Sequence, residues 1–182
     1  MSSLVKTIVW VSLFCLAGCS ATQLAVPVPE RLQLLPPGQG PAAVLLKQRV
    51  TMEAWGQQYQ FLAVTRLEAG RSQLVALLPT GQPLLSLDYD GKALKQENLS
   101  SMDIRGEDIL SIMQFALWPE ISISLNYPPE EGWQVEMKPQ ERVLLNDSGA
   151  VLKVRYEKKG MTVENYLRNY RVEIQTLEKT EL

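Results

Sequence analysis

The chain has 182 residues, and its 18 basic and 20 acidic side chains leave a formal net charge of −2 at pH 7. This balance, without runs of like charge, argues against a nucleic-acid partner. The sequence has no histidine and only two cysteines, which excludes Ser-His-Asp catalysis and most zinc or copper sites. We therefore expect no metal and no cofactor.

Residues 1–18 have the layout of a secretory signal peptide, with Lys6 before an apolar stretch and small residues at its end. The apolar stretch, from Ile8 to Leu16, is shorter than the roughly 20 residues that a membrane span needs. The alternatives are an ordinary signal peptide with a cysteine nearby by chance, or an uncleaved transmembrane helix.

The sequence Leu16-Ala17-Gly18-Cys19 resembles the lipobox of bacterial lipoproteins. The resemblance implies cleavage before Cys19, which would carry three acyl chains and anchor the protein in a membrane. Each buried methylene contributes about 0.8 kcal/mol to such an anchor. Ser20 stands where an aspartate would retain a lipoprotein at the inner membrane, so we expect the outer membrane, with the protein on its periplasmic face.

Residues 19–41 are predicted to be the lipidated cysteine and a proline-rich tether, because five prolines keep this segment out of helix and sheet. Two apolar pieces, Leu24–Val28 and Leu32–Leu35, suggest that part of the tether packs on the domain. The remaining residues, 42–182, are long enough for one domain with its own core.

The domain begins with segments that alternate apolar and polar residues, as half-buried strands do. The predicted strands before residue 100 lie around Val44–Met52, Gln57–Glu68, Ser72–Leu78, Leu84–Tyr89 and Lys92–Asn98. Asp90-Gly91 is a hairpin signal between the last two.

One helix is predicted from about Arg105 to Trp118, capped by Asp103 and ended by Pro119. It has almost no polar face, so it must be covered on most sides. The strand pattern resumes at Ile121–Tyr127, Trp133–Lys138, Glu141–Leu145, Ala150–Tyr156 and Tyr170–Gln175. Nine or ten strands and one helix predict a mainly β (α+β) fold with an antiparallel sheet, since parallel strands would need a helix at each crossover.

Antiparallel sheets of this size curl, and one helix does not have to fill the concave face. The methionines at 52, 113, 137 and 161 would give a pliable lining. A fully packed sandwich or barrel, with the helix as ordinary core, is the alternative.

Two turns carry a second resemblance: Leu78-Pro79-Thr80-Gly81, and Leu87-Asp88-Tyr89-Asp90-Gly91 before the apolar helix. With the lipobox and tether, they resemble the LolA/LolB family over roughly residues 42–178. The chain is most similar to a LolB-like group of outer-membrane lipoproteins with a domain of unknown function, some encoded beside aryl polyene or fatty-acid-like biosynthetic enzymes. The resemblance implies an open antiparallel half-barrel with a helical lid, whose hollow holds acyl chains.

Two features differ from the family. We predict one lid helix where the family has several, and the apolar loop by which LolB delivers cargo has only Pro83-Leu84-Leu85 as a candidate. We favour these residues as the start of the next strand.

The sequence thus predicts a non-enzymatic, monomeric lipoprotein that binds acyl chains, a polyene or a lipoprotein cargo, for lipid or lipoprotein transfer with a periplasmic carrier protein. Its groove and lid would be formed by Val44, Leu46, Val50, Met52, Ile109, Ile112, Met113, Ala116, Leu117 and Trp118. The alternatives are an assembly lipoprotein that docks a protein partner without binding lipid, and a hydrolase without histidine.

The carboxylate pairs that a glycosidase would need are better explained locally, by a helix start, a turn and a hairpin. They are Glu107-Asp108, Glu130-Glu131, and Asp88 with Asp90. The tryptophans at 55, 118 and 133 are expected in the core or at its rim, and Arg105 and Arg155 on the solvated surface.

Overall fold

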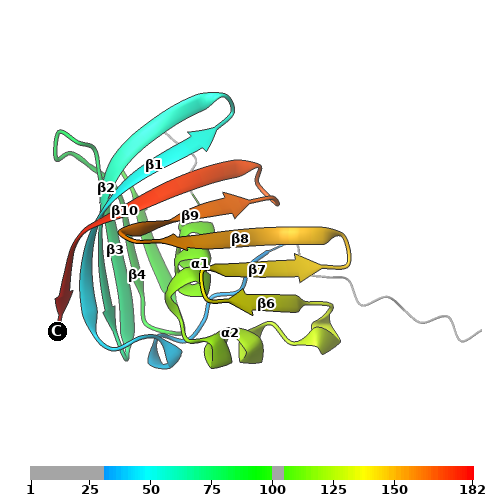
Figure 1. Ribbon diagram of the computed structural model, residues 1–182. Helices are drawn as coiled ribbons and strands as arrows, with labels where there is room; N and C mark the ends of the chain where they lie inside the picture. Colours follow the sequence, from blue (N-terminus) through cyan, green and yellow to red (C-terminus); the bar gives the residue numbers. More distant parts are fainter. Residues whose placement is uncertain (1–30, 100–104) are drawn as a thin grey trace, which may run out of the picture.

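The computed structural model describes residues 31–99 and 105–182, and the described chain forms one antiparallel sheet of ten strands in the order β5-β4-β3-β2-β1-β10-β9-β8-β7-β6 (Figure 1). The strands are β1 Val44–Ala54, β2 Gln57–Glu68, β3 Arg71–Leu77, β4 Pro83–Tyr89, β5 Leu94–Asn98, β6 Gln134–Lys138, β7 Glu141–Asn146, β8 Gly149–Glu157, β9 Gly160–Asn165 and β10 Tyr170–Glu181. Strands β5 and β6 are the two edges, so the sheet is open.

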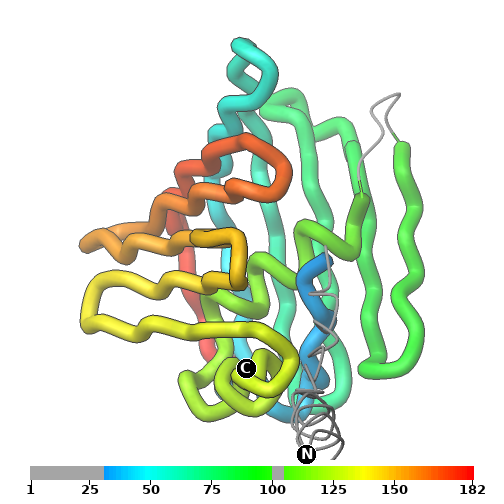
Figure 2. Tube along the Cα trace, turned by 90° about the vertical axis from the view of Figure 1, so that its right-hand side faces the viewer, coloured from blue at the N-terminus to red at the C-terminus, as the bar shows by residue number. Residues whose placement is uncertain are grey.

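The sheet curls around helix α1, Gly106–Leu117. Figure 2 shows β6–β9 on one side and β2–β5 on the other, with α1 between them. Inward positions of β1 are buried along most of the strand, as at Val44, Leu46 and Val50. The structure therefore confirms the predicted mainly β, open half-barrel with a helix on its concave face.

The prediction of a strand at Ile121–Tyr127 is wrong, because residues Glu120–Asn126 form helix α2. The same apolar residues fit a helix, because positions four apart share a face. Ile123 and Tyr127 are buried on one face, and Ile121 and Leu125 are exposed on another. Pro119 fits the helix start, and the Ser122 hydroxyl donates to the Gln39 carbonyl at 2.7 Å.

Strand β9 was not predicted, although it lies close to the middle of the sheet. Gly160 begins it, and a Cβ on this glycine would lie 1.9 Å from the Ile174 carbonyl oxygen of β10. The close approach of two backbones explains the glycine. Met161 and Val163 then point inward and are buried.

Residues 32–40, here called the strap, pack along α1 and α2 before β1 begins (Figure 2). Leu32 and Leu35 are buried in the core, and a 3-10 helix, η1 (Pro37–Gln39), ends the strap. The apolar piece Leu32–Leu35 thus packs on the domain as suspected. Leu24–Val28, the signal, Cys19 and Asp103 lie outside the described residues.

Pro83-Leu84-Leu85 begins β4, with both leucines buried, so the interpretation as the start of a strand is confirmed. Within residues 31–99 and 105–182, no helix combines the length and the apolar character needed to cross a bilayer.

Candidate ligand-binding surface

The concave face of the sheet carries apolar side chains in rows that run across five strands. The first row is Phe61, Val50, Ile174, Met161 and Tyr156. The second row is Tyr59, Met52, Val172, Val163 and Val154. On β9 these side chains are buried, whereas Phe61, Tyr59, Met52, Val172 and Ile174 are only half-buried. The inner surface of β2, β1 and β10 is therefore apolar and partly uncovered, and we call it the inner patch.

Helix α1 begins very close to the sheet. Its first residue, Gly106, donates its backbone N–H to the Gln96 side chain of β5 at 2.8 Å. A Cβ on Gly106 would lie 2.2 Å from Leu87 of β4, so a larger residue would push the helix away. Asp108 in the first turn faces Arg105 at 3.7 Å and Arg168 of the β9–β10 turn at 3.4 Å.

The other end of α1 is held by side chains from β7 and β8. Arg142 donates from Nη1 to the carbonyls of Phe115 at 2.9 Å, Ala116 at 3.3 Å and Trp118 at 2.7 Å. The Tyr156 hydroxyl donates to the Ala116 carbonyl at 2.6 Å, and burial raises the pKa of this tyrosine. A cation at a helix C-terminus also complements the helix dipole.

The face of α1 that points away from the sheet is covered by the strap. Gln114 is fully buried, and its carboxamide accepts from the Leu35 N–H at 2.7 Å and donates to the Leu35 carbonyl at 2.8 Å. Trp118 donates its indole N–H to the Pro36 carbonyl at 3.2 Å. Tyr127, whose pKa burial raises to about 12, accepts from the Gln33 N–H at 3.1 Å. These bonds explain how a helix without a polar face is covered on both sides.

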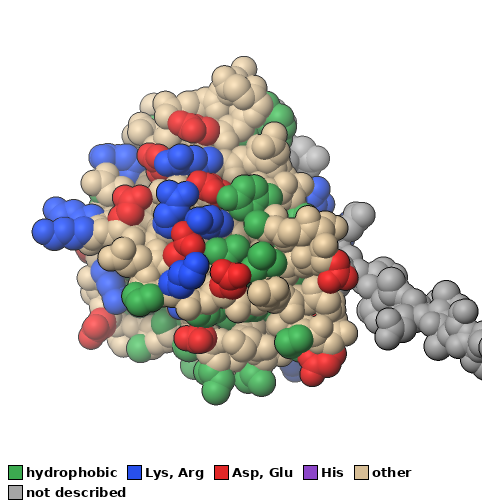
Figure 3. Space-filling model, turned by 45° about the vertical axis from the view of Figure 1, so that its right-hand side comes forward, with side chains coloured by type: hydrophobic (Ala, Val, Ile, Leu, Met, Phe, Trp, Pro, Cys, Tyr) green, Lys and Arg blue, Asp and Glu red, His purple; other side chains and the backbone are tan. Residues whose placement is uncertain are grey.

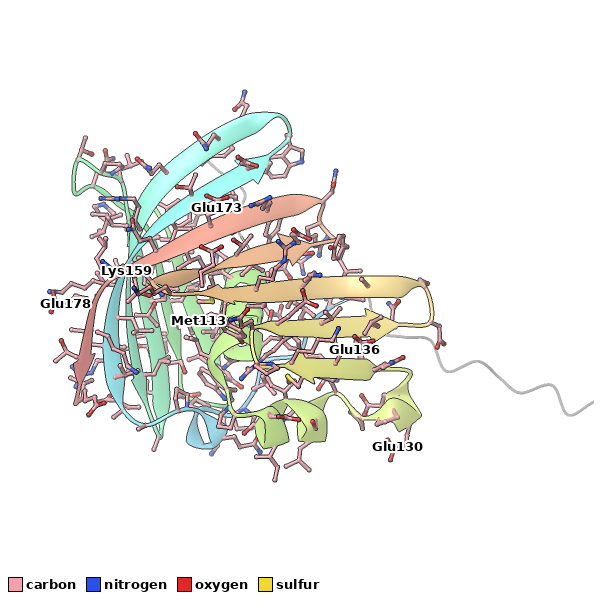
Figure 4. All side chains as sticks on the ribbon, viewed as in Figure 1. Met113, Glu130, Glu136, Lys159, Glu173 and Glu178 are labelled. Carbon is pink, nitrogen blue, oxygen red and sulfur yellow. The ribbon has the colours of Figure 1, made fainter. Side chains whose placement is uncertain are left out.

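The ten residues predicted to form the groove and lid lie on the concave face of the sheet, on α1 or at its end. Seven are buried: Val44, Leu46, Val50, Ile112, Met113, Ala116 and Trp118. Met52, Ile109 and Leu117 are half-buried. Figure 4 shows Met113 inside the curl and Glu173 and Glu178 outside it. Because most of these side chains pack on one another, an acyl chain entering beneath α1 would have to displace the helix.

Two clefts lie at the β6–β7 turn, where the sequence analysis predicted no site. The first, of about 560 Å³, is lined by Lys138, Pro139, Gln140, Glu141, Arg155, Tyr156 and Glu157. The second, of about 350 Å³, is lined by Glu120, Met137, Lys138, Pro139, Arg142 and Tyr156. Both mix charges of opposite sign. Figure 3 likewise shows basic and acidic side chains interleaved on this side of the molecule.

The carboxylates that sequence analysis considered for catalysis make local contacts. Asp88 accepts a hydrogen bond from Arg71, which lowers the pKa of this carboxyl. Asp90 accepts from the N–H groups of Ala93 and Lys92 in the hairpin, and these bonds lower its pKa. Glu131 accepts from the Gln33 side chain at 3.2 Å. Among the described residues, no group of three or more acidic or cysteine side chains could hold a metal ion.

The sequence pattern did not point to Gln114, Arg142 and Gly106, which position α1. A glutamine in the middle of an apolar helix was the one available signal, since a buried amide needs partners. Trp118 and Trp133 are buried as expected, but Trp55 is 81% exposed.

The fold defines the class of this protein as an open antiparallel β half-barrel with a helix inside it. Residues 45–178 match the model of the family described as "Protein of unknown function (DUF3261)". The chain therefore belongs to this family. No curated protein matches the chain.

Solved structures that resemble the chain include an outer membrane lipoprotein-sorting protein domain from Vibrio parahaemolyticus, with a TM-score of 0.41 and 8% identity over 77% of this chain and 85% of that one. A LolA superfamily protein from Nitrosomonas europaea has a TM-score of 0.43 and 8% identity, over 81% and 90%. A DUF1329 family protein from Desulfovibrio piger has a TM-score of 0.33 and 7% identity, over 76% and 85%.

Proposed function

We propose that this chain is a non-enzymatic, outer-membrane lipoprotein of the periplasmic face that binds an acyl chain or a similar lipidic molecule on its inner patch. The observation that carries the proposal is the half-burial of Phe61, Tyr59, Met52, Val172 and Ile174 on a concave face. Apolar surface that the fold leaves in water contributes about 25 cal/mol per Å² when a ligand covers it.

The inner patch lacks the groups that chemistry would need and has those that a hydrocarbon tail needs. Its side chains are aliphatic, aromatic or thioether, and the sequence has no histidine. They are Tyr59, Phe61, Val50, Met52, Val172 and Ile174. Met52 adapts its shape to a flexible tail better than a branched side chain would. Transfer of the ligand to or from a periplasmic carrier protein would then depend on movement of α1 and the strap.

Met52→Asp tests this proposal directly. We expect the variant to bind a fluorescent fatty acid at least about tenfold more weakly, because a loss of about 1.4 kcal/mol corresponds to that factor and the side chain lies in the patch. Gln60→Asp is the matched control, since this exposed residue of β2 points to the outer face. The measurement is a fluorescence titration of both folded variants. Equal affinity in the two variants would overturn the assignment of the patch.

The second candidate function is an assembly lipoprotein that docks a protein partner. Ile121 and Leu125 favour it, because they lie one helical turn apart on α2 and are 71% and 68% exposed. Replacing both by serine should abolish that partner's binding and leave fatty-acid binding unchanged, so the two functions are separable.

A further inference from the structure

The turn between β1 and β2 is an unusual place for a tryptophan. Trp55 and Gly56 are its central residues, with φ of +52° and +73°, as in the hairpin turns that favour Asn-Gly. A bulky side chain is strained in this left-handed conformation. Trp55 is nevertheless 81% exposed, and a Cβ at Gly56 would meet nothing within 4 Å. The packing of the described residues gains little from this indole, and backbone strain of this kind concentrates at functional sites.

A second turn places two more exposed apolar side chains at the same end of the sheet. Ala54 pairs with Tyr170, so the β1–β2 turn and the β9–β10 turn lie next to each other. Tyr166 and Leu167 in the second turn are 49% and 38% exposed. We call Trp55, Tyr166 and Leu167 the apolar rim.

The strap begins at this end of the molecule. Gln33 bonds to Tyr127 and to Glu131; Glu131 ends the 3-10 helix η2, Pro129–Glu131, which leads into β6. The start of β6 pairs with the end of β7, beside the β7–β8 turn. In Figure 1 the β1–β2, β9–β10 and β7–β8 turns lie on the same side of the molecule.

The expected anchor is close along the chain to the start of the strap. Eleven residues separate Cys19 from Arg31, so even a fully extended segment, at about 3.6 Å per residue, reaches roughly 43 Å at most. A domain this close to its bilayer, with the chain entering at the rim end, can turn the rim toward the lipid.

We propose that the apolar rim docks on the phospholipid bilayer that holds the N-terminal anchor. Tryptophan and tyrosine are the side chains that concentrate at membrane–water interfaces, where the ring is apolar and one polar group stays hydrated. Docking would turn the rim end of the half-barrel toward the lipid. This proposal rests on the lipid anchor, but it does not require a ligand in the inner patch.

Tryptophan fluorescence tests the docking, because Trp118 and Trp133 are buried and Trp55 is exposed. The mature chain, cleaved before Cys19 and so without Trp10, is purified with its own anchor. It is reconstituted into phosphatidylethanolamine and phosphatidylglycerol vesicles with and without brominated acyl chains. We expect the brominated vesicles to cause a loss of Trp55 emission, and the vesicles to protect Trp55 from aqueous iodide. Trp55→Phe should remove both effects.

Two further variants separate docking from folding and from adsorption. Trp55→Asn puts a favoured residue into the turn, so it should melt no lower than the parent chain. In the parent chain we expect vesicles to slow hydrogen exchange at the β1–β2 turn amides, and this slowing should be lost in Trp55→Asn. Leu177→Trp in the Trp55→Phe chain places a reporter on an exposed bulge of β10 away from the rim, and it should stay open to iodide.

Iodide quenching of Trp55 that vesicles do not change would overturn the proposal. Bromine quenching of the Leu177→Trp reporter as strong as that of Trp55 would also overturn it, in favour of random adsorption. Shielding from iodide without bromine quenching would overturn it as well, because the rim would then contact a second copy of this chain and not the lipid. A chain that docks but binds no fatty acid would retain this proposal and refute the proposed function.

Discussion

Gln114→Glu is expected to lower the free energy of unfolding by about 3–5 kcal/mol at pH 8, the range observed when a buried charge is left without compensation. Gln114 is fully buried and donates its amide N–H to the Leu35 carbonyl. An ionised carboxylate has no proton to donate there and would face the carbonyl oxygen at close range.

The pH dependence of this variant identifies the cause. Burial raises the pKa of the new carboxyl in the folded state above the value near 4.3 of an unfolded chain. A group whose folded pKa is raised contributes stability at low pH, and the contribution is lost as the pH rises through the folded pKa. The loss of unfolding free energy in Gln114→Glu should therefore be smaller at pH 5, where the protonated carboxyl can donate to the Leu35 carbonyl.

Urea unfolding at pH 8 and pH 5 measures both values. Gln60→Glu, exposed on the outer face of β2, is the control and should change stability by less than about 0.5 kcal/mol. An equal loss at both pH values would show that the strap does not bind α1 through this amide.

Arg142→Ala is expected to lower the free energy of unfolding by about 2–4 kcal/mol. Hydrogen bonds to charged groups contribute about 1.5–3 kcal/mol each, and the three bonds of Arg142 to α1 share one donor atom. The Phe115, Ala116 and Trp118 carbonyls would lose their common donor. Arg142→Lys should retain part of the stability, since lysine keeps the positive charge but lacks the planar guanidinium group with its several N–H donors.

Hydrogen exchange of the α1 amides locates this effect. We expect faster exchange across α1 in Arg142→Ala and no change in Arg49→Ala, whose side chain is on the outer face of β1 and bonds Gln175. Exchange in α1 that is unchanged by Arg142→Ala would contradict the role of Arg142 in holding the helix.

The sheet was predictable because its strands alternate along the sequence. Val44, Leu46 and Val50 share a parity, and they are buried on one face. The same rule failed at Ile121–Tyr127, because alternation over seven residues also contains an i, i+4 pair on each helical face. Only tertiary contacts decide between the two, here the bonds from Ser122 and Asn126 to Gln39.

The position of the apolar helix was predictable, whereas the contacts that hold it were not. The apolar helix lies on the concave face, as its composition required. The strap that covers it could not be derived from pattern, because the Leu35–Gln114 bonds join residues 79 positions apart. The exposure of Trp55 was equally hidden, since a tryptophan between two strands has no sequence signal that separates core from rim.

Native mass spectrometry of the full chain, purified in mild detergent from the cells that make it, tests the central claim most directly. We predict a population that carries one additional lipidic molecule, lost on activation and reduced in Met52→Asp but not in Gln60→Asp. A chain that carries its own anchor and no further lipid, in the parent and in both variants, would contradict a lipid-binding half-barrel.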